Sequence, residues 1–426
     1  MAQSNGRRDR WDSRTAFVLA AIGSAVGLGN IWRFPYICYS NGGGAFFIPY
    51  LVALFTAGIP LLILEFGIGQ MMQGSAPVAL RKTNRHSEWV GWFALLVSTI
   101  IGVYYAVIMA WCVEYLVYAF RGFFTHGAMP WTAFPRGEEA FFTEKIRRQF
   151  TAAGELWQYH WPIILGLAAT WIGVFFVIAF GVKGIGKVVR WTVPIKIVVL
   201  AILIVRGLTL PGAAEGIRYF LTPNMAALTQ AKTWLAAYGQ IFFSLTIGFG
   251  VMIAYASYLP RDADVANNAF ITGLGNCSVS FLAGFAVFSV VGYLALQKGV
   301  PVTEVASQSL GLVFVTYPTA VSKMGELGWL FPPVIGVLFF VMLLSLGIDS
   351  LFSLVEAVVS ALRDRFPWLT QGLLAALYCL FSLGVGILFF AGRAGINWLD
   401  CFDHWANDYG LAIVGLLQCL IVGYFF

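Results

Sequence analysis

The residues of this chain that could do chemistry are polar side chains embedded in long apolar segments. Polar and charged groups in such segments are costly to bury, so each is a candidate for function. Asn, Ser and Asp offer hard oxygen atoms, which are the ligands that sodium and similar cations prefer. The embedded residues are Asn30, Arg33, Glu65, Gln240, Ser244, Asn276, Ser280, Asp349 and Ser350.

The spacing of these residues places several of them together. Gln240 and Ser244 are four residues apart, as are Asn276 and Ser280, so each pair shares one face of a helix. Asp349 precedes a serine, which puts a carboxylate beside a hydroxyl. Each pair alone could equally form hydrogen bonds between packed helices. In combination with the two interrupted helices described next, the pairs favour cation sites.

Two apolar segments carry clustered glycines near their middle, AIGSAVGLGN at 21–30 and FSLTIGFG at 243–250. Glycine in a helix costs roughly 1 kcal/mol relative to alanine. A helix broken inside a membrane exposes backbone groups, which is tolerated only where the break lines a cavity. The glycines could instead serve close helix packing alone. Their occurrence in two segments, each with embedded polar side chains, favours a pair of broken helices.

The elements that position these residues are transmembrane helices. The chain has 426 residues, of which 59% are hydrophobic and 11% charged, and its mean hydropathy is +0.80. Soluble domains carry roughly 25% charge, and about 20 apolar residues span a bilayer. Strands are disfavoured because no segment alternates. We expect an all-α integral membrane protein with ten spans, at about 15–38, 45–72, 90–120, 161–181, 190–210, 234–258, 266–297, 331–362, 370–391 and 403–426.

The interrupted segments are the first and sixth of the ten, so they head two halves of five. Five is odd, so the halves lie in opposite orientations, and this pattern is typical of inverted-repeat transporters. The expected parts are an N-terminal segment 1–14, a first repeat 15–210, an extracellular loop 211–233 and a second repeat 234–426.

Lys and Arg are frequent in the short segments on the side of the N-terminus, which predicts that both termini are cytoplasmic. A multi-pass protein of the plasma or inner membrane is expected, with the lipid bilayer as its partner.

No basic stripe indicates nucleic-acid binding, and no acid/base or metal-ligand cluster indicates an enzyme. A channel would show a repeated filter or pore ring. A sodium-gated sensor that does not transport is a further alternative. The oligomeric state is not predictable.

Two further interpretations concern a pair of charged residues near span ends and a glycine-rich segment between spans. Lys196 and Glu114 are expected to extend their polar ends toward the membrane surface. The segment 181–187 fits GxxxxGK, but Val188 stands where a phosphate-binding loop needs Ser or Thr. We therefore expect a short loop between spans there, without nucleotide binding.

Longer motifs resemble the neurotransmitter:sodium symporter family. They are GSAVGLGNIWRFP at 23–35, NGGGAF at 41–46, and GQIFFS at 239–244 continuing through GFG at 248–250 to YASY at 255–258. The resemblance covers residue 8 to the C-terminus and implies a 5+5 inverted repeat that works by sodium-driven alternating access. Most members have eleven or twelve spans, whereas ten are expected here.

The resemblance implies binding residues position by position. A first sodium ion would use Ala25, Asn30, Ser244, Asn276 and the substrate carboxylate, and a second would use Gly23, Val26, Leu346, Asp349 and Ser350. Chloride would bind Tyr50, Gln240, Ser244, Asn276 and Ser280. The substrate would contact Ala25, Gly27, Leu28, Gly29, Ile101, Tyr105, Phe243, Thr246, Phe249, Ser350 and Leu354.

The resemblance also implies gates and a substrate class. Arg33 and Asp403 would pair on the outer side, with Tyr105 and Phe249 as an aromatic lid; Arg8 and Asp364 would pair on the inner side, near Trp11 and Tyr258. Monoamine carriers of the family have Asp where this chain has Gly27. The substrate is therefore expected to bring its own carboxylate, as an α-amino acid does, and the apolar pocket residues predict an apolar side chain.

Overall fold

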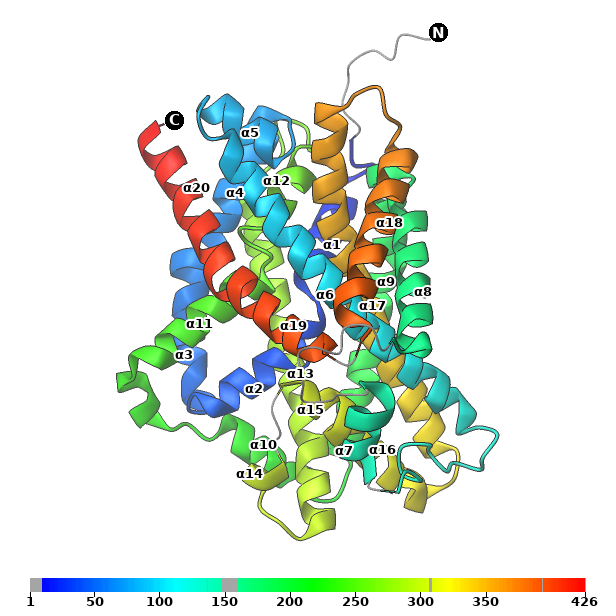
Figure 1. The fold of residues 1–426 in the computed structure, drawn as a ribbon. Helices are drawn as coiled ribbons and strands as arrows, with labels where there is room; N and C mark the ends of the chain where they lie inside the picture. The colour runs from blue at the N-terminus through cyan, green and yellow to red at the C-terminus, as the bar shows by residue number, and fades with distance from the viewer. Residues whose placement is uncertain (1–9, 136, 148–158, 306–308, 393, 426) are drawn as a thin grey trace.

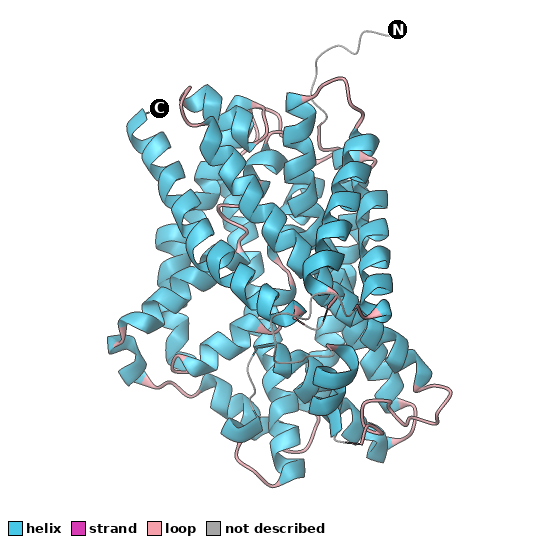
Figure 2. Ribbon diagram, viewed as in Figure 1, coloured by secondary structure: helices cyan, strands magenta, loops and turns pink. Residues whose placement is uncertain are grey.

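The chain folds into a bundle of helices (Figures 1 and 2). The structure, a computed structural model, describes residues 10–135, 137–147, 159–305, 309–392 and 394–425. In these ranges the only β-structure is a pair of isolated bridges, Gly43–Pro223 and Tyr159–Gly392. The expectation of an all-α membrane fold is confirmed.

The helices have the following bounds. The α-helices are α1 (Arg14–Ala25), α2 (Arg33–Ser40), α3 (Phe47–Ala53), α4 (Ile59–Met72), α5 (Ala76–Thr83), α6 (Glu88–Arg121), α7 (Gly137–Ala140), α8 (Trp161–Ile178), α9 (Gly181–Leu208), α10 (Ala213–Leu221), α11 (Ala231–Ser244), α12 (Val251–Ala256), α13 (Val265–Lys298), α14 (Val302–Val305), α15 (Ser309–Gly311), α16 (Tyr317–Lys323), α17 (Phe331–Arg365), α18 (Gln371–Phe390), α19 (Gly395–Asp403) and α20 (Leu411–Phe425). Short 3₁₀ turns are η1 (Leu28–Asn30), η2 (Gly44–Phe46), η5 (Met225–Thr229) and η7 (Met324–Leu327), and π-turns are η3 (Leu54–Gly58), η4 (Phe141–Ile146), η6 (Leu312–Thr316) and η8 (His404–Gly410).

Within the described ranges, eight helical segments are long and apolar enough to cross a membrane, and a ninth span is a pair bent by 60°. The bent pair joins Arg14–Ala25 to Leu28–Ser40, which is the first predicted span. The sixth predicted span consists of α11 and α12, separated by residues 245–250. The first and sixth predicted spans are thus interrupted near the predicted positions. The division of the chain into repeats 15–210 and 234–426 stays a prediction.

Side-chain caps begin several of the helices. Ser13 accepts a hydrogen bond from the backbone of Ala16 at the start of α1, at 3.1 Å. Asp264 accepts one from Asn267 at the start of α13, at 3.0 Å. These side-chain oxygens satisfy backbone N–H groups that have no partner inside the helix. The caps therefore fix where these spans enter the bundle.

The first helix lies inside the bundle. α1 contacts α9, α13 and α17, and α6 packs along α17. In Figure 1, α1 begins at the same end of the molecule at which α20 ends. The break after α1 is therefore surrounded by protein, where the freed backbone groups can find new partners.

The structure corrects three predictions, two of them on helix α9. This helix begins at Gly181, so the GxxxxGK segment lies in its first turns and not in a loop. A hydropathy pattern locates the apolar stretch, but a helix continues beyond that stretch because its backbone still bonds internally. The Lys196 side chain is only 2% exposed and bonds to Asp349, so it does not extend to the membrane surface. Glu114, at 7% exposure, is also buried.

Candidate substrate and ion site

The first break follows the glycine cluster. α1 ends at Ala25, and Val26 leaves the helical conformation with ψ 86°. The chain resumes as η1 and α2, and the Oδ1 of Asn30 accepts a hydrogen bond from the Gly27 amide at 2.9 Å. Carbonyl groups at the end of α1 thereby lose their partners in the next helical turn. The last carbonyl oxygens of α1 instead accept hydrogen bonds from side chains of other helices in the middle of the bundle, as the Ser24 carbonyl does from Thr246 and Ser350.

The second break is a strained segment anchored by neighbouring helices. Thr246 has φ 57°, and Gly248 has φ 85°. Left-handed backbone is uncommon for a β-branched residue, and strain of this kind persists only where the surroundings impose it. Glu65 accepts from the Gly248 amide at 3.1 Å, and Ser98 donates to the Phe249 carbonyl at 2.6 Å. The predicted intramembrane Glu65 thus stabilises the break, a role that the sequence did not indicate.

A small cavity of about 40 Å³ lies between the two breaks. Ten of the eleven predicted substrate residues line it, and Leu28 is the exception. Leu28 is fixed next to it, because its amide donates to the Tyr105 hydroxyl at 3.1 Å. The lining consists of Ser24, Ala25, Gly27, Gly29, Asn30, Ile101, Tyr105, Phe243, Ser244, Thr246, Phe249, Ser350 and Leu354.

Two glycines of the first break bring the backbone close to the cavity walls. A Cβ at Gly27 would lie 2.6 Å from the Ser350 Oγ, and a Cβ at Gly29 would lie 2.7 Å from a ring carbon of Phe243. Both distances are shorter than any ordinary contact, so a side chain at either position would displace a wall of the cavity. Position 27 therefore has no room for a carboxylate side chain in this conformation.

The residues predicted for the first sodium ion form one buried cluster. The Nδ2 of Asn30 donates to the Oδ1 of Asn276 at 2.8 Å and to the Oγ of Ser280 at 2.7 Å. The Nδ2 of Asn276 donates to the Oγ of Ser244 at 2.8 Å. Ala25, Asn30 and Ser244 also line the cavity. The cluster therefore borders the space between the breaks.

Next to this cluster lie the remaining residues predicted for chloride. Gln240 is fully buried, and neither polar atom of its amide has a hydrogen-bond partner among the described residues. Tyr50 is buried as well. A buried amide without partners is costly, and such a group usually awaits a water or an ion. Gln240 and Ser244 share a face of α11, as their spacing predicted.

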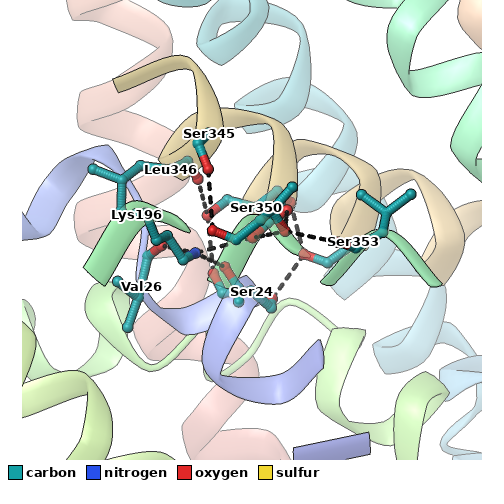
Figure 3. A network of polar contacts seen from close by, with 12 residues as sticks. Ser24, Val26, Lys196, Ser345, Leu346, Ser350 and Ser353 are labelled. Atoms are coloured by element: carbon teal, nitrogen blue, oxygen red, sulfur yellow. Dashed lines mark hydrogen bonds and ion pairs between the residues drawn. The ribbon is translucent and has the colours of Figure 1, made fainter. Parts of the chain in front are cut away.

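Three of the residues predicted for the second sodium ion contact the ammonium group of Lys196, whose surroundings are drawn in Figure 3. Its Nζ lies 3.0 Å from the Oδ2 of Asp349, 3.1 Å from the Val26 carbonyl and 3.4 Å from the Gly23 carbonyl. The ion pair is buried on both sides, at 2% and 0% exposure. The sequence singled out Asp349 and missed its partner on α9.

The outer gate residues border a larger cavity of about 640 Å³. Arg33 and Asp403 both line this cavity, but they do not form an ion pair in this conformation. Asp403 instead accepts a hydrogen bond from the Tyr104 hydroxyl at 2.6 Å, and the Arg33 guanidinium lies 4.6 Å from the Phe243 ring centre. Phe243 and Tyr105 line both cavities, so they separate the larger one from the space between the breaks.

The opposite side is closed by packing around Trp11. Its Nε1 donates to the Tyr255 carbonyl at 2.9 Å, and its ring packs edge-on against Tyr255 and Tyr258. The Tyr258 hydroxyl donates to Glu356 at 2.7 Å, a partner that the sequence did not indicate. Asp364 accepts from the Ser75 amide at 2.8 Å. Its predicted partner Arg8 lies outside the described residues.

Comparisons with known proteins define the class. A family model for the sodium:neurotransmitter symporter family matches residues 8–134 and 131–426. The chain belongs to this family, as the motifs predicted. The similar proteins are named as transporters, and the family relationship supports sodium-coupled transport of small substrates.

Three of the similar proteins come from an archaeon, a mouse and a rat. An uncharacterized sodium-dependent transporter of Methanocaldococcus jannaschii is 42% identical, over 98% of this chain and 82% of that protein. The sodium- and chloride-dependent GABA transporter 2 of Mus musculus is 34% identical, over 98% and 73%. The sodium- and chloride-dependent taurine transporter of Rattus norvegicus is 34% identical, over 99% and 72%.

Proposed function

We propose that this chain carries an α-amino acid with an apolar side chain across the plasma membrane together with sodium. The observation that carries the proposal is the cavity between the two helix breaks, with the cluster of Asn30, Ser244 and Asn276 at its border. Freed carbonyls and side-chain amides supply the oxygens that a hard cation needs. The backbone amides that follow the first break favour an anionic group.

Sodium would bind between the Ala25 carbonyl and the side chains of Asn30, Ser244 and Asn276. The amide nitrogen of Asn30 now donates into this cluster, and a half-turn of the amide would present its oxygen instead. The substrate carboxylate would complete the shell, so ion and substrate bind each other directly. This contact couples the two affinities, because each ligand provides part of the other's site.

The substrate class follows from the cavity walls. Gly27 leaves no side-chain charge in the cavity, so the acidic group must come with the substrate. Ile101, Phe249 and Leu354 form an apolar wall, and the small volume favours a short apolar side chain. Relatives named for GABA and taurine also take small molecules with an acidic group.

One side of the bundle is closed and the other is open, as alternating access requires. The Trp11 packing closes the side of the termini, and the larger cavity opens on the side of Arg33 and Asp403. With the termini in the cytoplasm, this conformation faces outward. Closure of the outer side would bring Arg33 and Asp403 together, and a partly solvated pair of this kind separates at moderate cost.

Chloride is proposed to bind beside the first sodium ion. The support is the unpartnered amide of Gln240, one helical turn before Ser244, and the neutral Ser280 hydroxyl beside Asn30, with no carboxylate in this group to balance a cation. The mammalian relatives are named as chloride-dependent. Uptake should fall when chloride is replaced by gluconate, and unchanged uptake would contradict this site.

A binding screen tests the substrate class. Purified protein is titrated with the twenty amino acids, GABA and taurine, each in sodium or choline salts. We expect sodium-dependent binding of a small apolar amino acid such as valine. Isobutylamine, which is valine without its carboxylate, should bind at least about 100-fold more weakly, because the first ion then loses a ligand. Equal binding of valine and isobutylamine would refute the proposed site.

Counterflow separates a transporter from the alternatives. In proteoliposomes loaded with unlabelled substrate, external labelled substrate should accumulate transiently. A sensor that binds without transport would show binding but no counterflow. A channel would equilibrate label without transient accumulation.

A further inference from the structure

The second cluster of predicted sodium ligands already contains a cation of the protein itself. Lys196 projects from α9 and places its Nζ within 3.4 Å of the Gly23 carbonyl, 3.1 Å of the Val26 carbonyl and 3.0 Å of Asp349. Figure 3 shows this side chain reaching between Val26 and the α17 residues around Leu346. Three of the five groups predicted to hold sodium therefore contact an ammonium.

The number of contacts fits an ammonium group. A lysine ammonium has three N–H donors and no acceptor. The Nζ has three oxygen neighbours, which are two carbonyls and one carboxylate oxygen. A neutral amine would direct its lone pair at one of these oxygens.

The neighbouring residues hold the pair in place. The Thr192 hydroxyl, one turn before Lys196 on α9, lies 2.8 Å from the Oδ1 and 2.9 Å from the Oδ2 of Asp349. Gly23 allows α17 to approach, because a Cβ there would lie 3.3 Å from the Oδ2 of Asp349. Lys196 lies on the buried stripe of α9 with Val193 and Leu200, so its stem packs inside the bundle. The ammonium thus joins α1, α9 and α17 at the first break.

We propose that the Lys196 ammonium takes the place of the second sodium ion, so that one sodium ion accompanies each substrate. This inference rests on the proposed function and specifies its ion stoichiometry. The ammonium carries the same charge as sodium and satisfies the same oxygens, so a second ion would be repelled by a fixed like charge. Ion binding at the first cluster, beside Asn30, then remains the step that couples sodium to transport.

The number of coupled sodium ions sets how far the substrate can be accumulated. With one sodium ion per substrate, the limiting accumulation of substrate follows the first power of the sodium ratio. A tenfold sodium gradient without a membrane potential would then give about tenfold accumulation, whereas two ions would give about 100-fold.

Wild-type protein provides the first test, which needs no variant to fold. Equilibrium binding of labelled substrate is measured against sodium concentration, and bound ²²Na⁺ is counted at saturating substrate. We expect a Hill coefficient of about 1 and one sodium per protein, since Hill coefficients reach at most the number of sites. A coefficient near 2 with two bound ions would overturn the inference and leave the proposed function intact. Substrate binding without any sodium dependence would contradict the proposed function itself.

Two substitutions at Lys196 separate its charge from its packing. Lys196→Ala removes the ammonium and opens space beside Asp349, so sodium should enter and the Hill coefficient should rise to about 2. Lys196→Met removes the charge but fills the space, so substrate binding should be at least about 100-fold weaker at every sodium concentration. Lys187→Ala, on the same helix with no role in the cluster, should keep a coefficient of about 1. An unchanged coefficient in folded Lys196→Ala protein would overturn the inference.

Discussion

A methyl group added at Gly27 should weaken substrate binding by a magnitude that follows from the cavity geometry. The Cβ of Gly27→Ala would lie 2.6 Å from the Ser350 Oγ and 3.2 Å from the Tyr105 hydroxyl oxygen. Gly27 has φ −113°, which alanine adopts without strain, so the effect is confined to the cavity. Overpacking of this kind costs about 1–3 kcal/mol. Binding should therefore be about 5- to 150-fold weaker.

A second substitution tests the assigned cause. Ser350→Ala removes the clashing Oγ, and the nearest remaining Ser350 atom is the Cβ at 3.6 Å. The single Ser350→Ala variant loses hydrogen bonds from its hydroxyl to the carbonyls of Ser24 and Leu346, at 3.0 and 3.4 Å, which costs about 1 kcal/mol. The double variant should bind more tightly than Gly27→Ala alone, with a coupling of about 1 kcal/mol or more.

The assay is equilibrium binding of labelled substrate to purified protein in saturating sodium. Gly239→Ala on α11 is the matched control, because a Cβ there meets nothing within 4 Å. Wild-type affinity in Gly27→Ala would refute the position of the substrate. A double variant that binds no better than Gly27→Ala would show that Ser350 is not the group that clashes.

Three further substitutions address the ions and the second break. Asn30→Ala removes the buried hydrogen bonds that the Asn30 side chain makes to the first break and to the first cluster, and should abolish sodium-dependent binding while the protein stays folded. Near-normal affinity would contradict the assignment of this cluster to sodium. Ser280→Glu places a fixed negative charge beside the sodium site and should make uptake independent of chloride, whereas Ser278→Ala on the exposed face of α13 should leave the dependence unchanged. Glu65→Ala leaves the buried Gly248 amide unpaired and should lower the free energy of unfolding by about 1–3 kcal/mol. Thermal unfolding in detergent measures this last change, and an unaltered midpoint would show that Glu65 does not anchor the break.

The helix breaks were predictable because their cause is local. Glycines clustered in an apolar segment weaken a helix wherever the segment lies, so the interruptions at 26–27 and 245–250 follow from composition. Helical spacing likewise placed Gln240 with Ser244, and Asn276 with Ser280. The conformation of Thr246 was not predictable, because its positive φ is imposed by tertiary contacts.

Lys196 shows why other parts of the site were missed. In a membrane protein both faces of a span are apolar, so hydrophobic periodicity does not show which face meets the protein interior. The buried stripe of α9 contains Val193, Lys196 and Leu200, while Ile195 and Val198 are exposed. Only the packed structure distinguishes these faces. The hydrogen bond from Tyr104 to Asp403 was missed for a similar reason, since residues 104 and 403 meet only in the folded bundle.

The central claim is that sodium and an amino acid share the space between two broken helices and move together. The most direct test is uptake of labelled substrate, identified by the binding screen, into proteoliposomes under an imposed inward sodium gradient. We expect accumulation above the external concentration, which collapses when the gradient is dissipated or when Asn30→Ala protein is used. Equal uptake under a potassium gradient of the same size would contradict the account.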